Sequence, residues 1–147
     1  MKKILLTLVV SALFSSCATM TLYDWGGTGM RSASAYEQLT YNHYDKQTPE
    51  SFCSLLCLYE KMVTRPGGSR KMPPPGICAE YGYMLLLPQA AETFLNHASS
   101  AQRAQFKDRD IASYFHGRGT EMLEKEIALY PESVVFIRPL LKKLSGK

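Results

Sequence analysis

One amphipathic helix pattern constrains the fold of this chain more than any other feature. Thr48-Pro49-Glu50 is a strong helix start, because threonine caps, proline suits the first helical position and glutamate suits the positive end of the dipole. The apolar side chains that follow recur every three or four residues: Phe52, Leu55, Leu56, Tyr59, Met62 and Val63. The pattern predicts a helix with one broad apolar face, which must be buried against other elements.

Shorter helical patterns make up the rest of the chain, with proline or glycine between them. We expect helices from about Ser34, over 75–87, near 91–98, near 106–115, over 120–130 and from 131 onwards. Gly117-Arg118-Gly119 is expected to separate two of them, and Pro139 to kink or split the last. No segment alternates for long like a strand, so the predicted fold class is all-α, a small antiparallel helical array. The helix after Ser34 is expected to present four side chains on one face: Tyr36, Leu39, Tyr41 and Tyr44.

The start of the chain has the order of a secretory signal peptide. Met1-Lys2-Lys3 is positive, Ile4 to Phe14 is an apolar run, and small residues lead directly to Cys17. The run is shorter than the roughly 20 apolar residues that a membrane span needs. Because the cysteine follows small residues, the segment resembles a bacterial lipoprotein signal. The alternative is an ordinary secretory signal that is cut after Ala18.

The lipoprotein resemblance implies a modification and a location. Cys17 is then lipidated on its sulfur, the chain is cut before it, and the new amine receives a fatty acid such as palmitate. Several acyl chains on one residue hold a protein firmly at a membrane. Ala18 follows the cysteine and no acidic residue comes before Asp24, which resembles the enterobacterial outer-membrane pattern. We therefore expect an outer-membrane lipoprotein with its body in the periplasm.

The mature chain is long enough for one domain. Removal of residues 1–16 leaves 147 less 16, or 131, residues. The predicted organisation is a signal peptide over 1–16, the lipidated cysteine and a tether over 17–33, and one helical domain over 34–147. The 17 basic residues lose Lys2 and Lys3, which leaves 15 against 13 acidic ones and a net charge of +2. This balance is not a nucleic-acid footprint, so no nucleic-acid partner is expected.

Three cysteines remain in the mature chain besides Cys17, namely Cys53, Cys57 and Cys78. Cys53 and Cys57 lie on adjacent turns of the predicted 48–63 helix. A disulfide from that helix to Cys78 would close a long loop and stabilise the fold by about 2–4 kcal/mol in an oxidising compartment. The alternative is that all three are small buried apolar side chains.

No motif indicates catalysis, a metal or a cofactor. His43, His97 and His116 form no His-Glu-x-x-His motif, and the cysteine pair lacks a second ligand pair at zinc spacing. Gly-x-Ser-x-Gly is missing, and the glycine-rich segments 26–29 and 67–71 lack the spacing of a phosphate loop. We therefore expect a protein that is not an enzyme and that uses no cofactor.

Two stretches of the sequence resemble an uncharacterised family of small bacterial lipoproteins. The first is 22–27 (LYDWGG), followed by Tyr36-Glu37, and the second is 74–85 (PPGICAEYGYML), followed by 123–126 (LEKE) and 130–133 (YPES). With the lipoprotein signal, the resemblance covers most of residues 17–144. Members are often encoded beside two other lipoproteins, one of them similar to the curli-type secretion channel protein. The resemblance implies a compartment and neighbours, and no known activity.

The second stretch also has spacing similar to that of a tetratricopeptide repeat. Tyr81-Gly82 is similar to the first helix of such a repeat, and Gly119, Leu123, Ile127 and Pro131 are similar to the ladder of its second helix. A repeat has a period of about 34 residues, whereas residues 88–116 separate the two half-motifs here. The pattern therefore fits one divergent repeat with an insertion, or any other antiparallel helix pair.

Aromatic residues are concentrated near the start of the mature chain. Tyrosine and tryptophan are favoured at protein interfaces, because each joins a large apolar area to a hydrogen-bonding group. Tyr23, Trp25 and Tyr36 are therefore candidate partner-binding residues. The alternative is that they pack the N-terminal segment onto the helices.

Two functions of different class follow from these patterns. The first is a non-enzymatic, lipid-anchored adaptor or assembly partner of an envelope protein complex, with the curli-channel-like lipoprotein as a candidate partner. The second is a binding protein for a small envelope ligand, such as a peptide or a peptidoglycan fragment. An adaptor predicts an exposed aromatic patch, whereas a ligand binder predicts an enclosed pocket with convergent polar groups.

Replacement of Cys17 by serine tests the lipid anchor. We expect Cys17→Ser to abolish lipidation and to leave an uncleaved precursor, because no other residue can accept the lipid. Metabolic labelling with a radioactive fatty acid, followed by gel electrophoresis, measures both effects. A variant that still takes up the label would show that the anchor is elsewhere.

Overall fold

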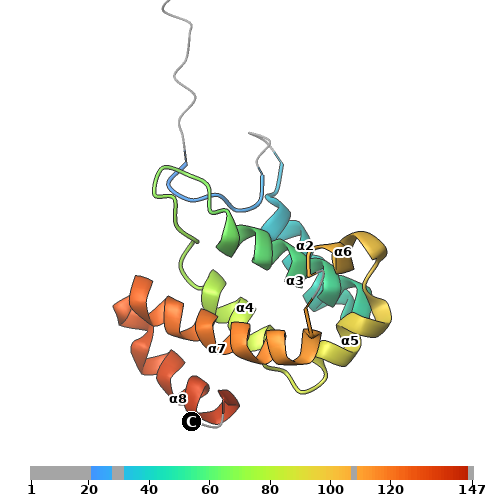
Figure 1. The fold of residues 1–147 in the computed structure, drawn as a ribbon. Coiled ribbons are helices and arrows are strands. Elements are labelled where there is room, and N and C mark those ends of the chain that lie inside the picture. The colour runs from blue at the N-terminus through green and yellow to red at the C-terminus, as the bar shows by residue number, and fades with distance from the viewer. Residues whose placement is uncertain (1–20, 28–31, 107–108, 146–147) are drawn as a thin grey trace, which may run out of the picture.

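The computed structural model describes residues 21–27, 32–106 and 109–145, and the predicted signal peptide and the predicted lipidation site Cys17 lie outside them. The described residues form helices and no strand, so the predicted all-α class is confirmed (Figure 1). The helices are α2 (Ala35–Lys46), α3 (Pro49–Thr64), α4 (Ile77–Leu85), α5 (Ala90–His97), α6 (Ser100–Ala104), α7 (Ile111–Leu129), the 3-10 helix η1 (Pro131–Ser133) and α8 (Val134–Ser145).

The predicted amphipathic helix is α3, and it is the central helix of the fold. It packs against α2, α4, α5 and α6, and Leu55, Leu56 and Tyr59 are fully buried. The helix begins where the sequence predicts, because the amide of Ser51 donates to the Thr48 hydroxyl at 3.2 Å and Pro49 occupies the first turn. The apolar face of α3 therefore organises the main core.

The pair with the most extensive contact is α4 and α7, the two helices that carry the repeat-like half-motifs. A Cβ atom added to Gly82 would lie 2.8 Å from the carbonyl oxygen of Gly119, so the two backbones approach closely at this crossing. The expected break at Gly117-Arg118-Gly119 is wrong, because α7 is continuous from Ile111 to Leu129. A helical glycine costs up to about 1 kcal/mol, and close packing against α4 offsets that cost.

The N-terminal end of α4 is completed by α7. Gly76 precedes α4 and offers no side-chain cap. The buried carboxylate of Glu126 supplies one instead, since its Oε1 atom accepts the Gly76 amide at 2.8 Å. Burial raises the pKa of Glu126, against the effect of the backbone amides it accepts. The hydroxyl of Tyr130 donates to the Pro73 carbonyl at 2.6 Å, so the end of α7 also fastens the segment before α4.

The described residues of the predicted insertion 88–116 are 88–106 and 109–116, and they include α5, α6 and the start of α7. Phe94, Phe106 and Phe115 pack edge to face with ring centroids 5.0, 5.4 and 5.7 Å apart. This aromatic cluster belongs to the main core around α3. The insertion therefore extends the core over the N-terminal half of α3.

The last helix forms a smaller core on the other side of α4 and α7. Ile137 packs there with Leu86 and Leu123, and Leu140 joins them. α8 is a single helix that continues through Pro139, so the expected split does not occur. Proline at 139 cannot donate the helical hydrogen bond to the carbonyl of Val135, and Val135 is 71% exposed.

Helix α2 covers α3 with only part of its surface. Ser34 caps it, with the reciprocal bond to Glu37 of a capping box. Tyr36 and Leu39 pack on the core, but Tyr41 and Tyr44 are 75% and 63% exposed. The expectation of one broad face with four residues is therefore wrong for Tyr41 and Tyr44, because α2 packs chiefly on α3 and buries a narrow stripe.

All three described cysteines are free and buried. Burial raises the pKa of Cys53 to about 11 and that of Cys57 and Cys78 to about 12. The thiol of Cys53 lies 3.9 Å from the carbonyl of Thr93, which it meets as a weak donor. In this structure the cysteines act as small core side chains, and no bridge ties α3 to Cys78.

The crossing of α4 and α7 can be tested with matched glycine substitutions. We expect Gly82→Ala to destabilise the protein by about 1–3 kcal/mol, since its new methyl group meets the α7 backbone. Gly117→Ala is the control, because a Cβ there meets nothing within 4 Å, and it should stabilise α7 by about 0.5–1 kcal/mol. Urea unfolding measures both. A Gly82→Ala variant as stable as the parent would contradict the close approach.

Candidate interaction groove

An open groove of about 1100 Å³ lies along α3 in the described structure. The segment 21–27 and α2 contribute to one side of it, and α6 contributes to the other. Its lining side chains and backbone come from Asp24, Gly26, Ala35, Leu39, Ser54, Cys57, Leu58, Glu60, Lys61, Met62, Thr64, Arg65, Ala101, Gln102, Gln105 and Arg109. Because the groove is open and not enclosed, it suits a segment of another protein better than an enclosed small molecule.

The groove combines apolar side chains with positive charge. Leu39 and Leu58 supply apolar surface, while Lys61, Arg65 and Arg109 supply three cations. Among the described residues, neither Lys61 nor Arg65 forms an ion pair. The guanidinium of Arg109 lies 4.2 Å from the centre of the Tyr114 ring. The groove therefore combines apolar side chains with two cations that form no ion pair within the described part of the chain.

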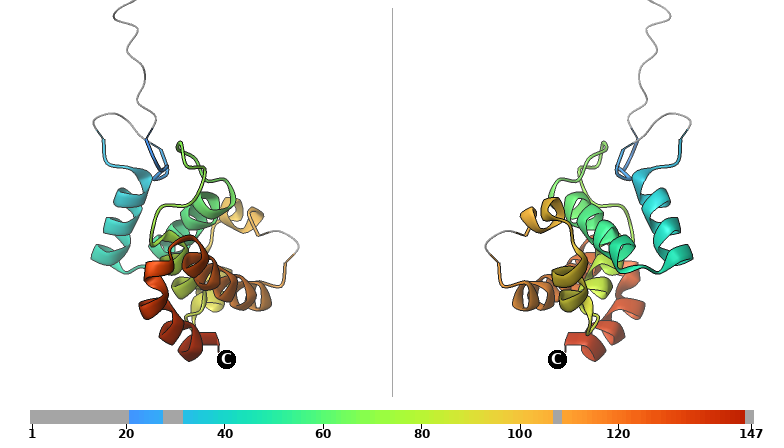
Figure 2. Two further views of the ribbon diagram at one scale, coloured as in Figure 1. Left: turned by 90° about the vertical axis from the view of Figure 1, so that its left-hand side faces the viewer. Right: turned by 90° about the vertical axis from the view of Figure 1, so that its right-hand side faces the viewer.

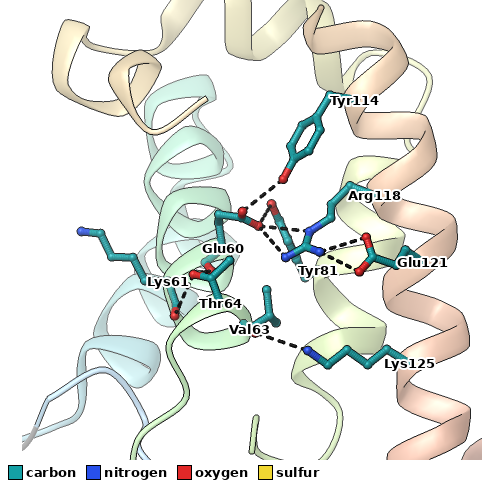
Figure 3. Close-up of polar contacts among 9 residues, drawn as sticks. All are labelled: Glu60, Lys61, Val63, Thr64, Tyr81, Tyr114, Arg118, Glu121 and Lys125. Carbon is teal, nitrogen blue, oxygen red and sulfur yellow. Dashed lines mark hydrogen bonds and ion pairs between the residues drawn. The ribbon is translucent and has the colours of Figure 1, made fainter. Parts of the chain in front are cut away.

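The two acidic residues of the groove are already engaged. Asp24 accepts the amides of Gly26 and Gly27 at 2.9 and 3.0 Å. Glu60 lies on the buried side of α3, and its carboxylate is directed toward α4 and α7 (Figure 3). Neither acid neutralises the exposed cations by an ion pair in the described structure.

Glu60 is the centre of a buried polar cluster (Figure 3). Its carboxylate accepts the hydroxyls of Tyr81 and Tyr114 at 2.9 and 3.1 Å, and it pairs with Arg118 at 3.3 Å. Arg118 also binds Glu121, with nitrogen to oxygen distances of 2.8 and 2.9 Å. A buried carboxylate with this many donors is fully compensated, which is the condition for a stable buried charge.

The cluster keeps its hydroxyls protonated and its arginine charged. Burial, and then the negative charge of Glu60, raise the pKa of Tyr81 well above its usual value. Burial opposes the charge on Arg118, but its bonds to Glu121 and the charge of Glu60 raise the net pKa of the guanidinium. The arrangement is therefore a fixed clamp between α3, α4 and α7.

A second carboxylate, Glu80, anchors α2 and α3 to α4. The Tyr36 hydroxyl donates to both Glu80 oxygens at 3.0 and 3.1 Å, and Tyr59 donates to the same carboxylate. Burial, and then the charge of Glu80, raise the pKa of Tyr36 to about 12. Three aromatic rings form a row that leads to the buried Tyr59. The ring centroids of Trp25 and Tyr36 are 5.1 Å apart, and those of Tyr36 and Tyr59 are 6.2 Å apart.

The three predicted partner-binding residues hold the N-terminal segment in place. Trp25 packs on the core, and its carbonyl accepts the amide of Tyr36 at 3.0 Å. Tyr36 ties α2 to Glu80, and the Tyr23 hydroxyl accepts a bond from Arg70 at 3.1 Å. All three are half-buried, so in the structure their contacts are those of packing.

Sequence reasoning missed the cations of the groove. Ser54, Leu58 and Lys61 are spaced by four and three residues, which places them on one face of α3, and Arg65 follows four residues later at the C-terminal cap of that helix. That face lies beside the broad apolar face and has a mixed composition, so the sequence periodicity alone predicts that it is exposed to solvent. Only the positions of α2 and α6 show that it forms the floor of a groove.

The chain has no match among protein-family models, curated proteins or solved structures. The described residues hold no group of three or more histidine, cysteine or acidic side chains that could bind a metal. None of the described helices has the length and hydropathy to span a bilayer.

Substitutions at the two acidic partners of Arg118 test the clamp. We expect Glu60→Ala to destabilise the protein by about 3–5 kcal/mol, because it removes the buried partner of Arg118 and leaves the hydroxyls of Tyr81 and Tyr114 without their acceptor. Glu121→Ala is the matched control, since Glu121 binds the same arginine from an exposed position, and it should cost less than about 1 kcal/mol. Chemical denaturation measures both, and equal effects would show that the Glu60 pair is not structural.

Proposed function

We propose that this protein is a non-enzymatic, lipid-anchored adaptor of the outer membrane, which binds another envelope protein through the groove along α3. The observation that carries the proposal is the open groove itself, with its apolar side chains and with Lys61 and Arg65, which form no ion pair with any other described residue. An elongated amphipathic segment with acidic residues would complement both features. The partner is therefore an envelope protein with an accessible acidic segment.

The anchor and compartment of the proposal come from the sequence. The run from Met1 to Cys17 resembles a lipoprotein signal, and Ala18 resembles the outer-membrane pattern. The family resemblance adds a curli-channel-like lipoprotein as a candidate partner. The absence of enzymatic activity is part of the same proposal. The clustered carboxylates Glu60 and Glu80 are engaged as acceptors of tyrosine hydroxyls, which gives them a structural use.

Exposed aromatic side chains add further surface for a partner. Tyr44 on α2 and Tyr83 on α4 are 63% and 44% exposed. Burial raises the pKa of Tyr44, and the electrostatic effects of Glu80 and Tyr83 raise it further. Tyr44, Glu80 and Tyr83 are therefore close to one another. A protein adaptor is expected to expose such side chains. A small-ligand binder needs an enclosed pocket, which this groove is not.

Charge reversal in the groove tests the adaptor. Lys61→Glu combined with Arg65→Glu should reduce recovery of the partner at least about tenfold, because like charges across an interface cost several kcal/mol. The measurement is cross-linking in intact cells with the lipidated chain, followed by affinity purification and quantitative mass spectrometry. Lys142→Glu combined with Lys143→Glu is the control, since it makes the same change of charge on exposed positions of α8.

Two results would contradict the groove as the binding site. One is an equal loss of the partner in the control, and the other is full recovery with the groove variant. The melting temperature of each variant shows whether the fold survives. A groove-dependent small molecule detected by native mass spectrometry, in place of a protein, would support the alternative of an envelope-ligand binder.

A further inference from the structure

The described segment 21–27 is fastened to the connector between α3 and α4. The amide of Ser69 donates to the carbonyl of Thr21 at 3.0 Å, and the amide of Arg70 donates to the carbonyl of Leu22 at 3.1 Å. Gly68 has a φ of +74°, and a Cβ there would lie 2.6 Å from the Leu22 carbonyl oxygen. The start of the segment is therefore held against residues 67–70.

Chain length then limits where a lipid at Cys17 can lie. Cys17 precedes Thr21 by four residues, which span at most about 14 Å when fully extended. A domain of about 100 residues has a radius of gyration of about 13 Å, so this reach cannot carry the lipid around to the far side. Segment 21–27 and the 66–71 loop lie at one end of the molecule, and α8 lies at the opposite end (Figures 1 and 2).

The surface at the anchored end has the chemistry of a lipid-headgroup site. Arg70 and Lys71 are exposed on the loop, and Arg65 is exposed just before it. Leu22 is 58% exposed beside them. Arg70 is held in position by Tyr23, with its guanidinium 5.6 Å from the ring centre. Asp24 supplies the one carboxylate of segment 21–27, and it is occupied by the amides of Gly26 and Gly27.

We propose that Leu22, Arg70 and Lys71 form a membrane-contacting surface that binds the phosphates of anionic phospholipids in the same membrane that holds Cys17. The inference rests on the lipid anchor of the proposed function. The short tether selects phospholipid as the occupant, because it holds this surface within about 14 Å of the anchored residue. Arg70 and Lys71 bind the phosphates, and Leu22 contacts the region just below the headgroups.

The test uses the full acylated chain, purified in detergent and reconstituted into vesicles of phosphatidylcholine with or without phosphatidylglycerol. A fluorescent probe is attached at Ser69→Cys or, for comparison, at Lys142→Cys on α8, and a nitroxide on the lipid headgroups quenches it. The native cysteines 53, 57 and 78 are buried, and the parent chain treated in the same way corrects for any label they take up.

We expect stronger quenching at Ser69 than at Lys142 when phosphatidylglycerol is present, and weaker quenching at Ser69 in high salt. Arg70→Gln combined with Lys71→Gln should lower the ratio of docked to undocked protein about 25-fold, or about fivefold for each cation near an anionic surface. Lys142→Gln combined with Lys143→Gln removes the same charge from α8 and should leave the ratio unchanged.

The outcomes separate the two proposals. If mass spectrometry finds no acyl group on Cys17, the lipid anchor of the proposed function is wrong, and the proposed membrane-contacting surface is then wrong as well. If Cys17 is acylated but the two probes are quenched equally, or the Arg70 and Lys71 substitutions change nothing, the membrane-contacting surface alone is wrong. Quenching that is strong at Ser69 and lost in the loop variant supports it.

Discussion

The rest of this structure depends on the contacts that the buried carboxylate of Glu60 makes with its neighbours. It brings a buried negative charge from α3 to the hydroxyls of Tyr81 and Tyr114 and to the guanidinium of Arg118, so one group joins three helices (Figure 3). A buried pair of this kind fixes geometry more than it adds stability, because its desolvation offsets much of the attraction. It orients α3 so that Lys61 faces the groove while Glu60 faces the core.

The helices were predictable where local chemistry and burial agree. α3 follows from its Thr48 cap, its proline and its apolar spacing, and the structure has the helix that they predict. The glycines of α7 show where local reasoning fails. Gly119 is a helix breaker by propensity, but its missing side chain lets α4 approach. That approach is a contact between distant segments, which no local pattern contains.

The groove was less predictable than the helices for a related reason. In the sequence, Lys61 on α3 and Arg65 at the C-terminal cap of that helix look like ordinary solvent-facing cations. They become part of a site only because α2 on one side and α6 on the other enclose the face of α3 that carries Lys61. The aromatic residues show the reverse effect. Trp25 and Tyr36 have the composition of an interface, but Glu80 and the core provide them with partners inside the chain.

Two glycines bring segment 21–27 against the loop that follows the groove. Gly67 and Gly68 let the 66–71 loop approach Asp24 and Leu22 at distances that a Cβ atom would not tolerate. α3 leads directly into this loop, so Arg65 stands at the junction between the groove and the loop. A lipid at Cys17 would then fix the direction of the groove as well as its compartment, with its Arg65 end nearest the bilayer. A partner that reached the groove would meet it from the membrane side or along its length, and α8 would remain on the far side (Figure 2).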